Sequence, residues 1–477
     1  MALHHNLIDG DWVGNRFLPN INPSDLSETV GEFASATAEA AEGAIAAARD
    51  AFPAWSRSGI LERARLLRDT SQEILRRKDE IGALLSREEG KTLAEGIGET
   101  IRAAQIFEFF SGEALRLAGE VVPSVRPGVE VQVTREPLGV IGIITPWNFP
   151  IAVPAWKIAP ALCYGNTVVV KPAELAPACT WMLADILQRN GLPKGVMNLV
   201  IGKGSVVGQA MLESPDVDGI SFTGSVGTGR RVAEACARHM RRAQVEMGGK
   251  NPLVVLDDAD LDVAVDVALN GSFFSTGQRC TASSRLIVAE GIHDRFVAAL
   301  TEKMTTLRVG HAMDAGTQIG PVVDSGQLKQ DLDYIAAGRA EGATLVAGGE
   351  QVTRATEGYF LTPALFTGCT PAMRIMREEI FGPVAGVIRV RDYDEALAVA
   401  NGTEFGLSAG ICTTSLKHAT HFRRNAEAGM IMVNLPTAGV DFHVPFGGRK
   451  GSSFGAREQG RYAVEFFTSV KTCYVSG

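Results

Sequence analysis

Residues 219–229 read Gly-Ile-Ser-Phe-Thr-Gly-Ser-Val-Gly-Thr-Gly. Residues 219–223 have the composition of a buried strand, and after the glycine-rich turn we expect a helix over 230–240. Such a turn lets the backbone approach a diphosphate, which the free N–H groups of a helix N-terminus attract. The glycine spacing is G-x-x-G-x-G, not the usual dinucleotide spacing G-x-G-x-x-G. Taken alone, the turn is equally compatible with a purely structural connection.

Similar apolar runs on both sides of this turn are separated by helical stretches. Alternation of strand and helix predicts an α/β fold with a parallel sheet covered on both faces. A second alternation follows Cys280, with a strand over 284–289 and a helix over 293–307. The first series of expected strands is 139–145, 167–170, 196–201, 219–223 and 252–256, and the second series continues with 344–347 and 384–390.

Three parts of the chain, one near each end and one at 131–135, have short alternating segments that are typical of exposed strands. Residues 7–13 form an expected hairpin around the Asp9-Gly10 turn, and a helix-rich stretch follows over 38–118. Residues 131–135 and 468–475 also alternate. A strand at the C-terminus has a free edge, which needs a partner in the same subunit or in another.

Composition excludes several classes of function. The chain has 477 residues, a length that suggests two or three domains. A net charge of −8 and the absence of a basic tract argue against nucleic-acid and acidic-membrane partners. The seven cysteines are odd in number, widely spaced and without a C-x-x-C pair, which argues against a disulfide framework and a thiolate metal site. Residues 1–6 do not resemble a signal peptide and no apolar run reaches membrane-spanning length, so we expect a cytoplasmic protein.

Cys280, in Gly277-Gln278-Arg279-Cys280, is a candidate nucleophile. A thiol beside a tight turn can be held close to a substrate and to backbone donors. Upstream, Glu246 in Glu-Met-Gly-Gly-Lys is a carboxylate in a second glycine-lined turn, suited to activate the water that releases a captured acyl group. A single cysteine is more often an inert core residue, and the paired glutamate favours the catalytic interpretation.

Residues 145–150, Thr-Pro-Trp-Asn-Phe-Pro, place a side-chain amide between two prolines that fix the backbone. The Asn148 amide and the Cys280 backbone N–H are suitable donors to a developing oxyanion. The alternative is a rigid aromatic turn that serves packing.

Residues 171–174, Lys-Pro-Ala-Glu, follow an expected strand, where ligands bind in open parallel sheets. Glu174 can accept hydrogen bonds from both hydroxyls of an adenosine ribose, which favours NAD over NADP because the 2′-phosphate of NADP would meet a negative charge. In Glu378-Glu379-Ile380-Phe381-Gly382-Pro383, one carboxylate can hold a cofactor hydroxyl with Phe381 beside it. Both segments, taken singly, are also compatible with solvated surface loops.

Seven motifs, in the order in which they occur along the chain, are together specific for one protein family. With them the chain resembles the aldehyde dehydrogenase superfamily, of the NAD(P)-dependent hydrolytic type, over nearly its whole length. The motifs are 145–150, 171–174, 222–229, 246–251, 277–280, 379–383 and Pro445-Phe446-Gly447-Gly448. Within the family, residues 151–157 and 277–285 are most similar to bacterial α-ketoglutaric semialdehyde (2,5-dioxopentanoate) dehydrogenases.

The resemblance implies a role for each motif. Cys280 attacks the aldehyde, Asn148 and the Cys280 amide stabilise the oxyanion, hydride passes from the thiohemiacetal to NAD(P)⁺, and Glu246 activates water to hydrolyse the thioester. Lys171 and Glu174 hold the adenosine ribose, Ser225 and its glycines the diphosphate, and Glu379 with Phe381 the nicotinamide ribose. The full set of cofactor residues is Thr145, Pro146, Trp147, Lys171, Pro172, Glu174, Gly204, Phe222, Gly224, Ser225, Gly229, Gly248, Glu379 and Phe381.

The family fold implies two parallel-sheet α/β domains and a small β bridging element. The implied divisions are an NAD(P)-binding domain over 1–118 and 138–248, a catalytic domain over 249–450, and a bridging element over 119–137 and 451–477. Strands of the bridging element would pair between subunits of a homodimer or homotetramer.

The resemblance also places the aldehyde entrance. Phe149, Trp156, Phe274 and Phe446 would line it, and an aromatic sleeve favours apolar or aromatic aldehydes. Succinic semialdehyde dehydrogenases have arginines at the positions of Trp156 and Phe274, which argues against that activity here. Arg279 could face an acidic substrate, lower the thiol pKa, or be structural.

Three other functions are compatible with parts of the sequence. A CoA-acylating relative would gain nothing from a water-activating Glu246. A non-catalytic protein on the same fold would not need Cys280, Glu246 and Asn148 together. A plain thiol hydrolase needs a histidine partner, and none of the eight histidines lies in a comparable glycine-flanked loop.

Overall fold

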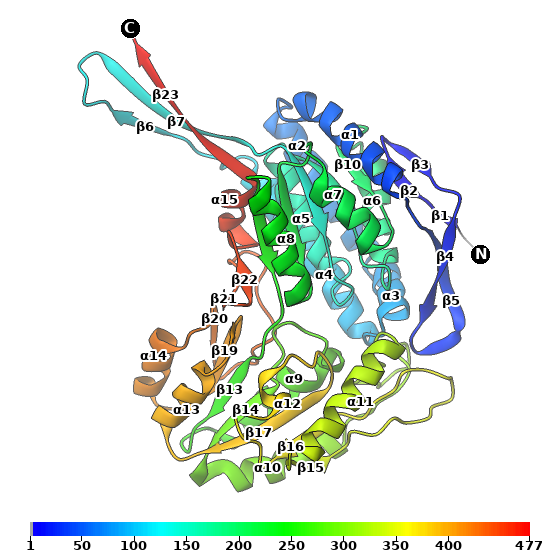
Figure 1. The fold of residues 1–477 in the computed structure, drawn as a ribbon, viewed down its shortest axis with the longest axis vertical. Helices are drawn as coiled ribbons and strands as arrows, with labels where there is room; N and C mark the ends of the chain where they lie inside the picture. The colour runs from blue at the N-terminus through cyan, green and yellow to red at the C-terminus, as the bar shows by residue number, and fades with distance from the viewer. Residues whose placement is uncertain (1–2) are drawn as a thin grey trace.

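The computed structural model describes residues 3–477 and is organised around two large β-sheets, one above the other in Figure 1. Residues 1–2, part of the N-terminal segment that was expected not to be a signal peptide, lie outside the described residues. The first sheet has eight strands and the second has seven. This arrangement confirms the predicted α/β class with two parallel-sheet units.

The first sheet has a parallel centre, β12-β11-β8-β9-β10, with antiparallel strands at both edges. Its central strands are apolar on both sides, so Val168 and Val170 enter one core and Val169 the opposite one. In order across the sheet, the strands are β22 (Ser453–Phe454), β12 (Arg242–Glu246), β11 (Gly219–Thr223), β8 (Val140–Ile144), β9 (Thr167–Lys171), β10 (Met197–Leu199), β2 (Asn6–Ile8) and β3 (Asp11–Val13).

Helices cover both faces of this sheet. One core includes residues of the long helices before β6 and of the helices after β8 and β9. These helices are α2 (Ile60–Arg76), α3 (Lys78–Glu89), α4 (Leu93–Glu113), α5 (Ala152–Cys163) and α6 (Ala178–Arg189). The opposite core includes α1 (Ala38–Trp55), the π-helical turn Gly204–Gly208, α7 (Gln209–Glu213) and α8 (Val226–Arg238).

The second sheet has the order β15-β16-β17-β14-β13-β19-β20 and is parallel except at β15. Its strands are β15 (Thr344–Ala347), β16 (Ala364–Thr367), β17 (Val384–Val390), β14 (Arg285–Ala289), β13 (Pro252–Val255), β19 (Ser408–Cys412) and β20 (Met430–Val433). Its helices are α9 (Leu261–Phe273), α10 (Glu290–Thr305), α11 (Ser325–Ala340), α12 (Arg374–Arg377), α13 (Tyr393–Asn401) and α14 (Leu416–Asn425).

A three-stranded arm projects from the body of the molecule (Figure 1). It contains β6 (Glu120–Pro123), β7 (Val129–Pro137) and β23 (Thr468–Ser476), and the chain enters β23 through α15 (Val464–Phe467). The C-terminal strand pairs antiparallel with β7 over nine positions, so its first partner lies within the same chain. Its other edge has no partner strand in residues 3–477, and its exposed side chains include Val470, Tyr474 and Val475.

Three features differ from the sequence expectations. The run 252–256 was placed with the first series of strands, but β13 lies inside the second sheet, between β14 and β19, because the chain crosses over after Glu246. Helix α8 begins at Val226 rather than 230, since the turn residues Gly227 and Gly229 are already helical. A small sheet of β1 (Leu3–His4), β5 (Asp25–Ala34) and β4 (Phe17–Asn22) was not expected.

The hairpin around Asp9-Gly10 is confirmed, with Asn6 opposite Val13 and positive φ angles of 51° and 79° at the two turn residues. The remaining short elements are β18 (Phe405–Gly406), which pairs with β21 (Arg449–Lys450), and the 3₁₀ turns Phe274–Gly277 and Gly460–Ala463.

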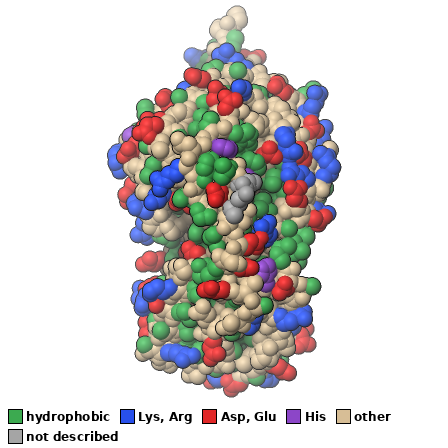
Figure 2. All heavy atoms as spheres, turned by 90° about the vertical axis from the view of Figure 1, so that its right-hand side faces the viewer, with side chains coloured by type: hydrophobic (Ala, Val, Ile, Leu, Met, Phe, Trp, Pro, Cys, Tyr) green, Lys and Arg blue, Asp and Glu red, His purple; other side chains and the backbone are tan. Residues whose placement is uncertain are grey.

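The surface carries acidic and basic side chains interspersed over both halves of the face shown in Figure 2. Across residues 3–477, no helix combines the length and the apolar character that crossing a bilayer requires. The same residues contain no group of three or more side chains arranged to hold a metal ion.

Candidate active site

A cavity of about 550 Å³ lies where the carboxyl ends of the first sheet meet the second sheet. Thr223 ends β11 and Glu246 ends β12, and both line this cavity. Parallel sheets bind ligands at this edge because the strand ends and helix N-termini converge there. Of the residues predicted from sequence, those that line it are Pro146, Trp147, Asn148, Phe149, Trp156, Gly224, Ser225, Glu246, Gly248, Arg279, Cys280, Glu379, Phe381 and Phe446.

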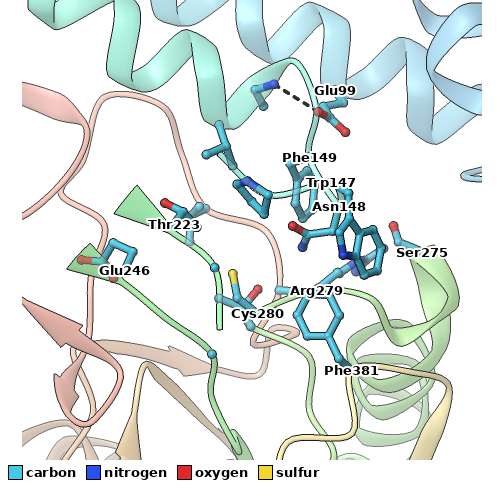
Figure 3. Close-up of a pocket in the computed structure, with 18 of the residues that line it drawn as sticks. Glu99, Trp147, Asn148, Phe149, Thr223, Glu246, Ser275, Arg279, Cys280 and Phe381 are labelled. Atoms are coloured by element: carbon cyan, nitrogen blue, oxygen red, sulfur yellow. Dashed lines mark hydrogen bonds between the residues drawn. The ribbon is translucent and has the colours of Figure 1, made fainter. Parts of the chain in front are cut away.

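Cys280 lies just after a strained turn. Ser275 and Thr276 have φ angles of 51° and 55°, a conformation unusual for residues with a Cβ. Gly277, at φ 66°, has no room for a side chain, since a Cβ there would lie 2.2 Å from the Gly382 carbonyl oxygen. The Asn251 amide donates to the Cys280 carbonyl at 2.8 Å. This loop directs the sulfur of Cys280 into the space between Thr223 and Asn148 (Figure 3).

Its surroundings keep the Cys280 thiol protonated. Burial, followed by the charges of the nearby Glu379 and Glu246 carboxylates, raises the pKa of Cys280 to about 12. The side chain is nevertheless partly open to the cavity. The thiol therefore needs a proton acceptor or a nearby positive charge before it can act as a nucleophile.

Asn148 is oriented by one of its two amide hydrogens. Its Nδ2 donates to the Gln278 carbonyl oxygen at 2.9 Å, and the side chain is only 4 % exposed. The backbone carbonyl oxygen of Asn148 accepts a hydrogen bond from Lys91 Nζ at 2.6 Å. The second amide hydrogen has no acceptor in the described part of the chain and is free to donate into the cavity that Cys280 also lines.

Glu246 is buried at the cavity wall, and its carboxyl end points away from Cys280 in Figure 3. Ser453 Oγ donates a hydrogen bond to it. Burial raises the pKa of Glu246 well above its ordinary value, and the charge of Glu458 raises it further. Glu458 forms a buried ion pair with Lys157, whose Nζ also donates to Ser221 Oγ at 2.9 Å.

Glu379 and Phe381 also line the cavity. The Gly249 N–H donates to Glu379 Oε1 at 3.1 Å, and a Cβ at Gly248 would lie 2.0 Å from the same carboxylate, so this backbone must approach it closely. Burial raises the pKa of Glu379 to about 7. The Phe381 ring contacts the Trp147 ring edge to face at 5.4 Å.

Eight of the predicted residues do not line this cavity. Four of them are near the end of β9: Lys171 is buried, and its Nζ donates to the Pro172 carbonyl oxygen at 2.7 Å. Gly204 lies beside Lys171, since a Cβ at Gly204 would be 3.8 Å from the Lys171 side chain. Glu174, three residues after Lys171, is exposed. Burial lowers the pKa of Lys171 to about 8. The others are Thr145 and Phe222, which are buried; Gly229, where a Cβ would lie 2.5 Å from Met247 Sδ; and Phe274.

Phe274 was expected at the aldehyde entrance, but the structure does not bring it into the cavity. The residue ends α9 with an extended backbone, φ −68° and ψ 152°. Its ring is partly buried against the core of the second sheet. By contrast, the rings of Trp156 and Phe446 contact each other at 5.4 Å, and both line the cavity.

Arg279 lines the cavity and forms an ion pair with Glu95 at 3.3 Å. The same carboxylate accepts hydrogen bonds from the Ser275 N–H at 2.8 Å and from its hydroxyl at 2.9 Å. Among the three possibilities for Arg279, these contacts favour the structural one, because its charge is compensated and it braces the turn before Cys280.

Several lining residues were not recognised in the sequence. Glu95, Glu99 and Arg102 occupy one face of α4 at helical spacing, and Gln327 and Gln330 are three apart on α11. Both patterns are visible in the sequence, but helical spacing alone does not show whether a polar face meets a cavity or solvent.

Comparison with known proteins decides the family. The family model described as "Aldehyde dehydrogenase family" matches residues 12–473. The chain belongs to the aldehyde dehydrogenase family. It is 44 % identical to an alpha-ketoglutaric semialdehyde dehydrogenase of Bacillus subtilis, over 98 % of this chain and 97 % of the relative. It is also 44 % identical to an alpha-ketoglutarate semialdehyde dehydrogenase of Haloferax volcanii, over 99 % and 98 %.

A solved aldehyde dehydrogenase structure has the same fold. The betaine aldehyde dehydrogenase of Staphylococcus aureus in complex with NAD⁺ is 34 % identical, with a TM-score of 0.97 over 99 % of this chain and 95 % of that one. The protein is thus an aldehyde dehydrogenase that oxidises an aldehyde with NAD(P)⁺, as the motifs predicted.

The residues of this aldehyde dehydrogenase fit a nicotinamide dinucleotide. The buried hydroxyl oxygen of Thr223 has no hydrogen-bond partner in residues 3–477, and Glu379 Oε2 accepts no hydrogen bond there. Gly224 and Ser225 expose the N-terminus of α8 to the cavity. Unsatisfied donors and acceptors beside a helix N-terminus suit the hydroxyls and diphosphate of such a cofactor.

Proposed function

We propose that this aldehyde dehydrogenase oxidises α-ketoglutaric semialdehyde (2,5-dioxopentanoate) to the dicarboxylic acid, with Cys280, Asn148 and Glu246 as its catalytic residues. The observation that carries the catalytic assignment is their convergence on one cavity. The substrate assignment is supported by the two relatives of 44 % identity that bear that name.

In the first step the Cys280 sulfur attacks the aldehyde carbon while the thiol proton passes to water in the cavity. The π electrons of the C=O bond move to the oxygen, which becomes an alkoxide that the free Asn148 amide hydrogen and the Cys280 backbone N–H stabilise. NAD(P)⁺, when bound, accepts the hydride and brings a positive charge to the cavity. The sulfur is then left acylated as a thioester.

In the second step Glu246 activates water. To do so its carboxylate leaves Ser453 and turns toward the cavity, where it accepts a proton from water. The water oxygen bonds to the thioester carbon, the C–S bond breaks, and the proton that Glu246 took from water passes to the thiolate. The raised pKa of Glu246 makes its ionised form a stronger base, and the Lys157–Glu458 pair lies close enough to influence that pKa.

Two alternative substrates follow from specific observations. The adjacent rings of Trp156 and Phe446 favour an aromatic or medium-chain apolar aldehyde. The similarity to betaine aldehyde dehydrogenase favours a cationic aldehyde. Steady-state assays of 2,5-dioxopentanoate, benzaldehyde, hexanal and betaine aldehyde with both cofactors distinguish them: we expect the highest kcat/KM for 2,5-dioxopentanoate. A higher value for any other member would refute the substrate assignment.

A CoA-acylating reaction is a different class of function. The water-activating position proposed for Glu246 argues against it. Acid formation in the absence of CoA, measured by chromatography, is the expected result; acid formation only after CoA addition would contradict the hydrolytic mechanism.

The preference for NAD over NADP is proposed to come from Glu174. This exposed carboxylate lies three residues after Lys171, at the end of β9, where it would repel a 2′-phosphate. We also propose the division into an NAD(P)-binding domain (1–118 and 138–248), a catalytic domain (249–450) and a bridging element (119–137 and 451–477), with β22 of the last segment completing the first sheet.

The exposed apolar side chains of β23 support assembly into a homodimer or homotetramer. Gel filtration with light scattering tests this, since replacement of Val470 and Tyr474 by Lys should shift an oligomer toward monomer. A cytoplasmic location is proposed from the seven cysteines, none of which forms a disulfide in the described chain.

A further inference from the structure

Helix α4 presents one polar face to the active-site cavity. Glu95, Gly98, Glu99 and Arg102 repeat at helical spacing, and all four line the cavity. The glycine leaves open space, since a Cβ at Gly98 would have no heavy atom within 4 Å. This face therefore forms part of the cavity wall and carries formal charges along it.

Both acidic groups of this face are compensated. Glu99 pairs with Lys91 at 2.7 Å and also accepts the N–H groups of Ile151 and Ala152 at 3.1 Å. Glu95 pairs with Arg279 at 3.3 Å. Two of the three cationic side chains that line the cavity, Lys91 and Arg279, therefore already have carboxylate partners.

Arg102 is the third cation, and it has no carboxylate partner. Within residues 3–477, its guanidinium donates one hydrogen bond, to the Val440 carbonyl oxygen, and no acidic group lies within ion-pair distance. Burial lowers the pKa of Arg102, and the exposed carboxylate of Asp441 opposes this only in part. A guanidinium has five N–H donors, so most of those of Arg102 are available to a ligand.

A half-buried cation that forms no ion pair favours an anionic ligand. The planar fork of arginine matches a carboxylate with two parallel hydrogen bonds. Asn270 lines the same cavity; its side-chain oxygen accepts from Arg279, which leaves its amide hydrogens as additional donors. Cys280, Arg102 and Asn270 line the same cavity. When the aldehyde carbon of a short substrate lies at Cys280, its far end is therefore available to Arg102 and Asn270.

We propose that Arg102 binds the distal carboxylate of the substrate and makes the enzyme selective for ω-aldehyde acids over neutral and cationic aldehydes. This inference rests on the proposed function and specifies the residue that recognises the acid end. Its like charge would also disfavour a quaternary ammonium aldehyde in the same place.

The experiment compares Arg102→Met with wild type on three aldehydes: 2,5-dioxopentanoate, glutaric semialdehyde and the neutral pentanal. Loss of a charge-assisted hydrogen bond pair should lower kcat/KM for both acids by about 10- to 100-fold, mainly through KM. The value for pentanal should stay near that of wild type. Arg102→Lys should recover part of the selectivity, and Arg102→Glu should shift preference toward betaine aldehyde.

Arg116→Met is a matched control, because Arg116 lies just beyond the same helix with a side chain 65 % exposed. It should leave all three kcat/KM values unchanged. Thermal unfolding of each variant separates misfolding from altered recognition, and the kcat/KM ratio of acid to neutral aldehyde is independent of the active fraction.

Equal losses for acids and pentanal would show that Arg102 only ties the Val440 loop to α4, and would overturn the proposal. Failure of the proposed function has a different signature. In that case wild type would prefer glutaric semialdehyde to 2,5-dioxopentanoate, while Arg102→Met would still lose its preference for acids.

Discussion

The side-chain amide of Asn148 donates a hydrogen bond to the carbonyl oxygen of Gln278, two residues before Cys280, at 2.9 Å. One contact thus couples the loop after β8 to the turn that carries the nucleophile. It fixes the amide so that its second hydrogen can meet an oxyanion without reorganisation, which is the basis of electrostatic catalysis in such sites.

Asn148→Ala should therefore lower kcat by about 10²- to 10³-fold, as loss of an oxyanion donor does elsewhere. Cofactor binding, followed by fluorescence titration, should be little changed. Steady-state kinetics measures the effect, and a kcat equal to that of wild type would exclude Asn148 from the oxyanion site.

The thiol of Cys280 should be unreactive in the free enzyme at neutral pH. Because its pKa is raised to about 12, the thiolate fraction and the rate of alkylation by iodoacetamide should rise about tenfold per pH unit between about pH 7 and 10. Cys473 is exposed, so the measurement uses a Cys473→Ser background and peptide mass spectrometry. A plateau below pH 9 would contradict a raised pKa.

Glu89 should make stability fall as pH rises. Burial raises the pKa of Glu89 to about 8, so between about pH 4.5 and 8 the folded state keeps a proton that the unfolded state has lost. The stabilising effect of that proton is present at low pH and lost through pH 8, with a slope of up to about 1.4 kcal/mol per pH unit. Glu89→Gln should flatten this part of the curve of unfolding free energy against pH, and an unchanged slope would contradict the assignment.

Glu174 should control the choice of cofactor. Glu174→Gln removes the charge that would repel a 2′-phosphate while it keeps a hydrogen-bond acceptor, so the ratio of kcat/KM for NAD to that for NADP should fall by about tenfold. Exposed Glu234, on α8, provides a control substitution outside this loop. No change in the ratio would place the ribose contact elsewhere.

The sequence predicted those strands and turns whose conformation is determined by neighbouring residues. Buried strands such as 167–170 are apolar throughout, and the turn at 9–10 has the residues that a tight hairpin requires. Glu246 and Asn148 reach one cavity because they follow strand ends that meet at the same edge of the first sheet, whereas Cys280 comes from the turn before β14 of the second sheet.

Relationships between distant segments could not be predicted. The contact of Glu246 with Ser453 joins residues 207 positions apart, and the Lys157–Glu458 pair spans 301. No spacing rule relates such residues, and the same holds for Arg102 beside Val440. Phe274 shows the reverse case: the family resemblance implied a place at the entrance, but its ring packs, partly buried, against the core of the second sheet, just before the turn at 275–276.

The acylation of Cys280 and its release by Glu246 are tested most directly in Glu246→Gln. Rapid mixing of this variant with NAD⁺ and 2,5-dioxopentanoate, followed by intact-protein mass spectrometry, should show a burst of NADH close to one per active site. It should also show a mass increase equal to the acyl group, absent in Cys280→Ala. A variant that turns over at the wild-type rate without an acylated species would contradict the account.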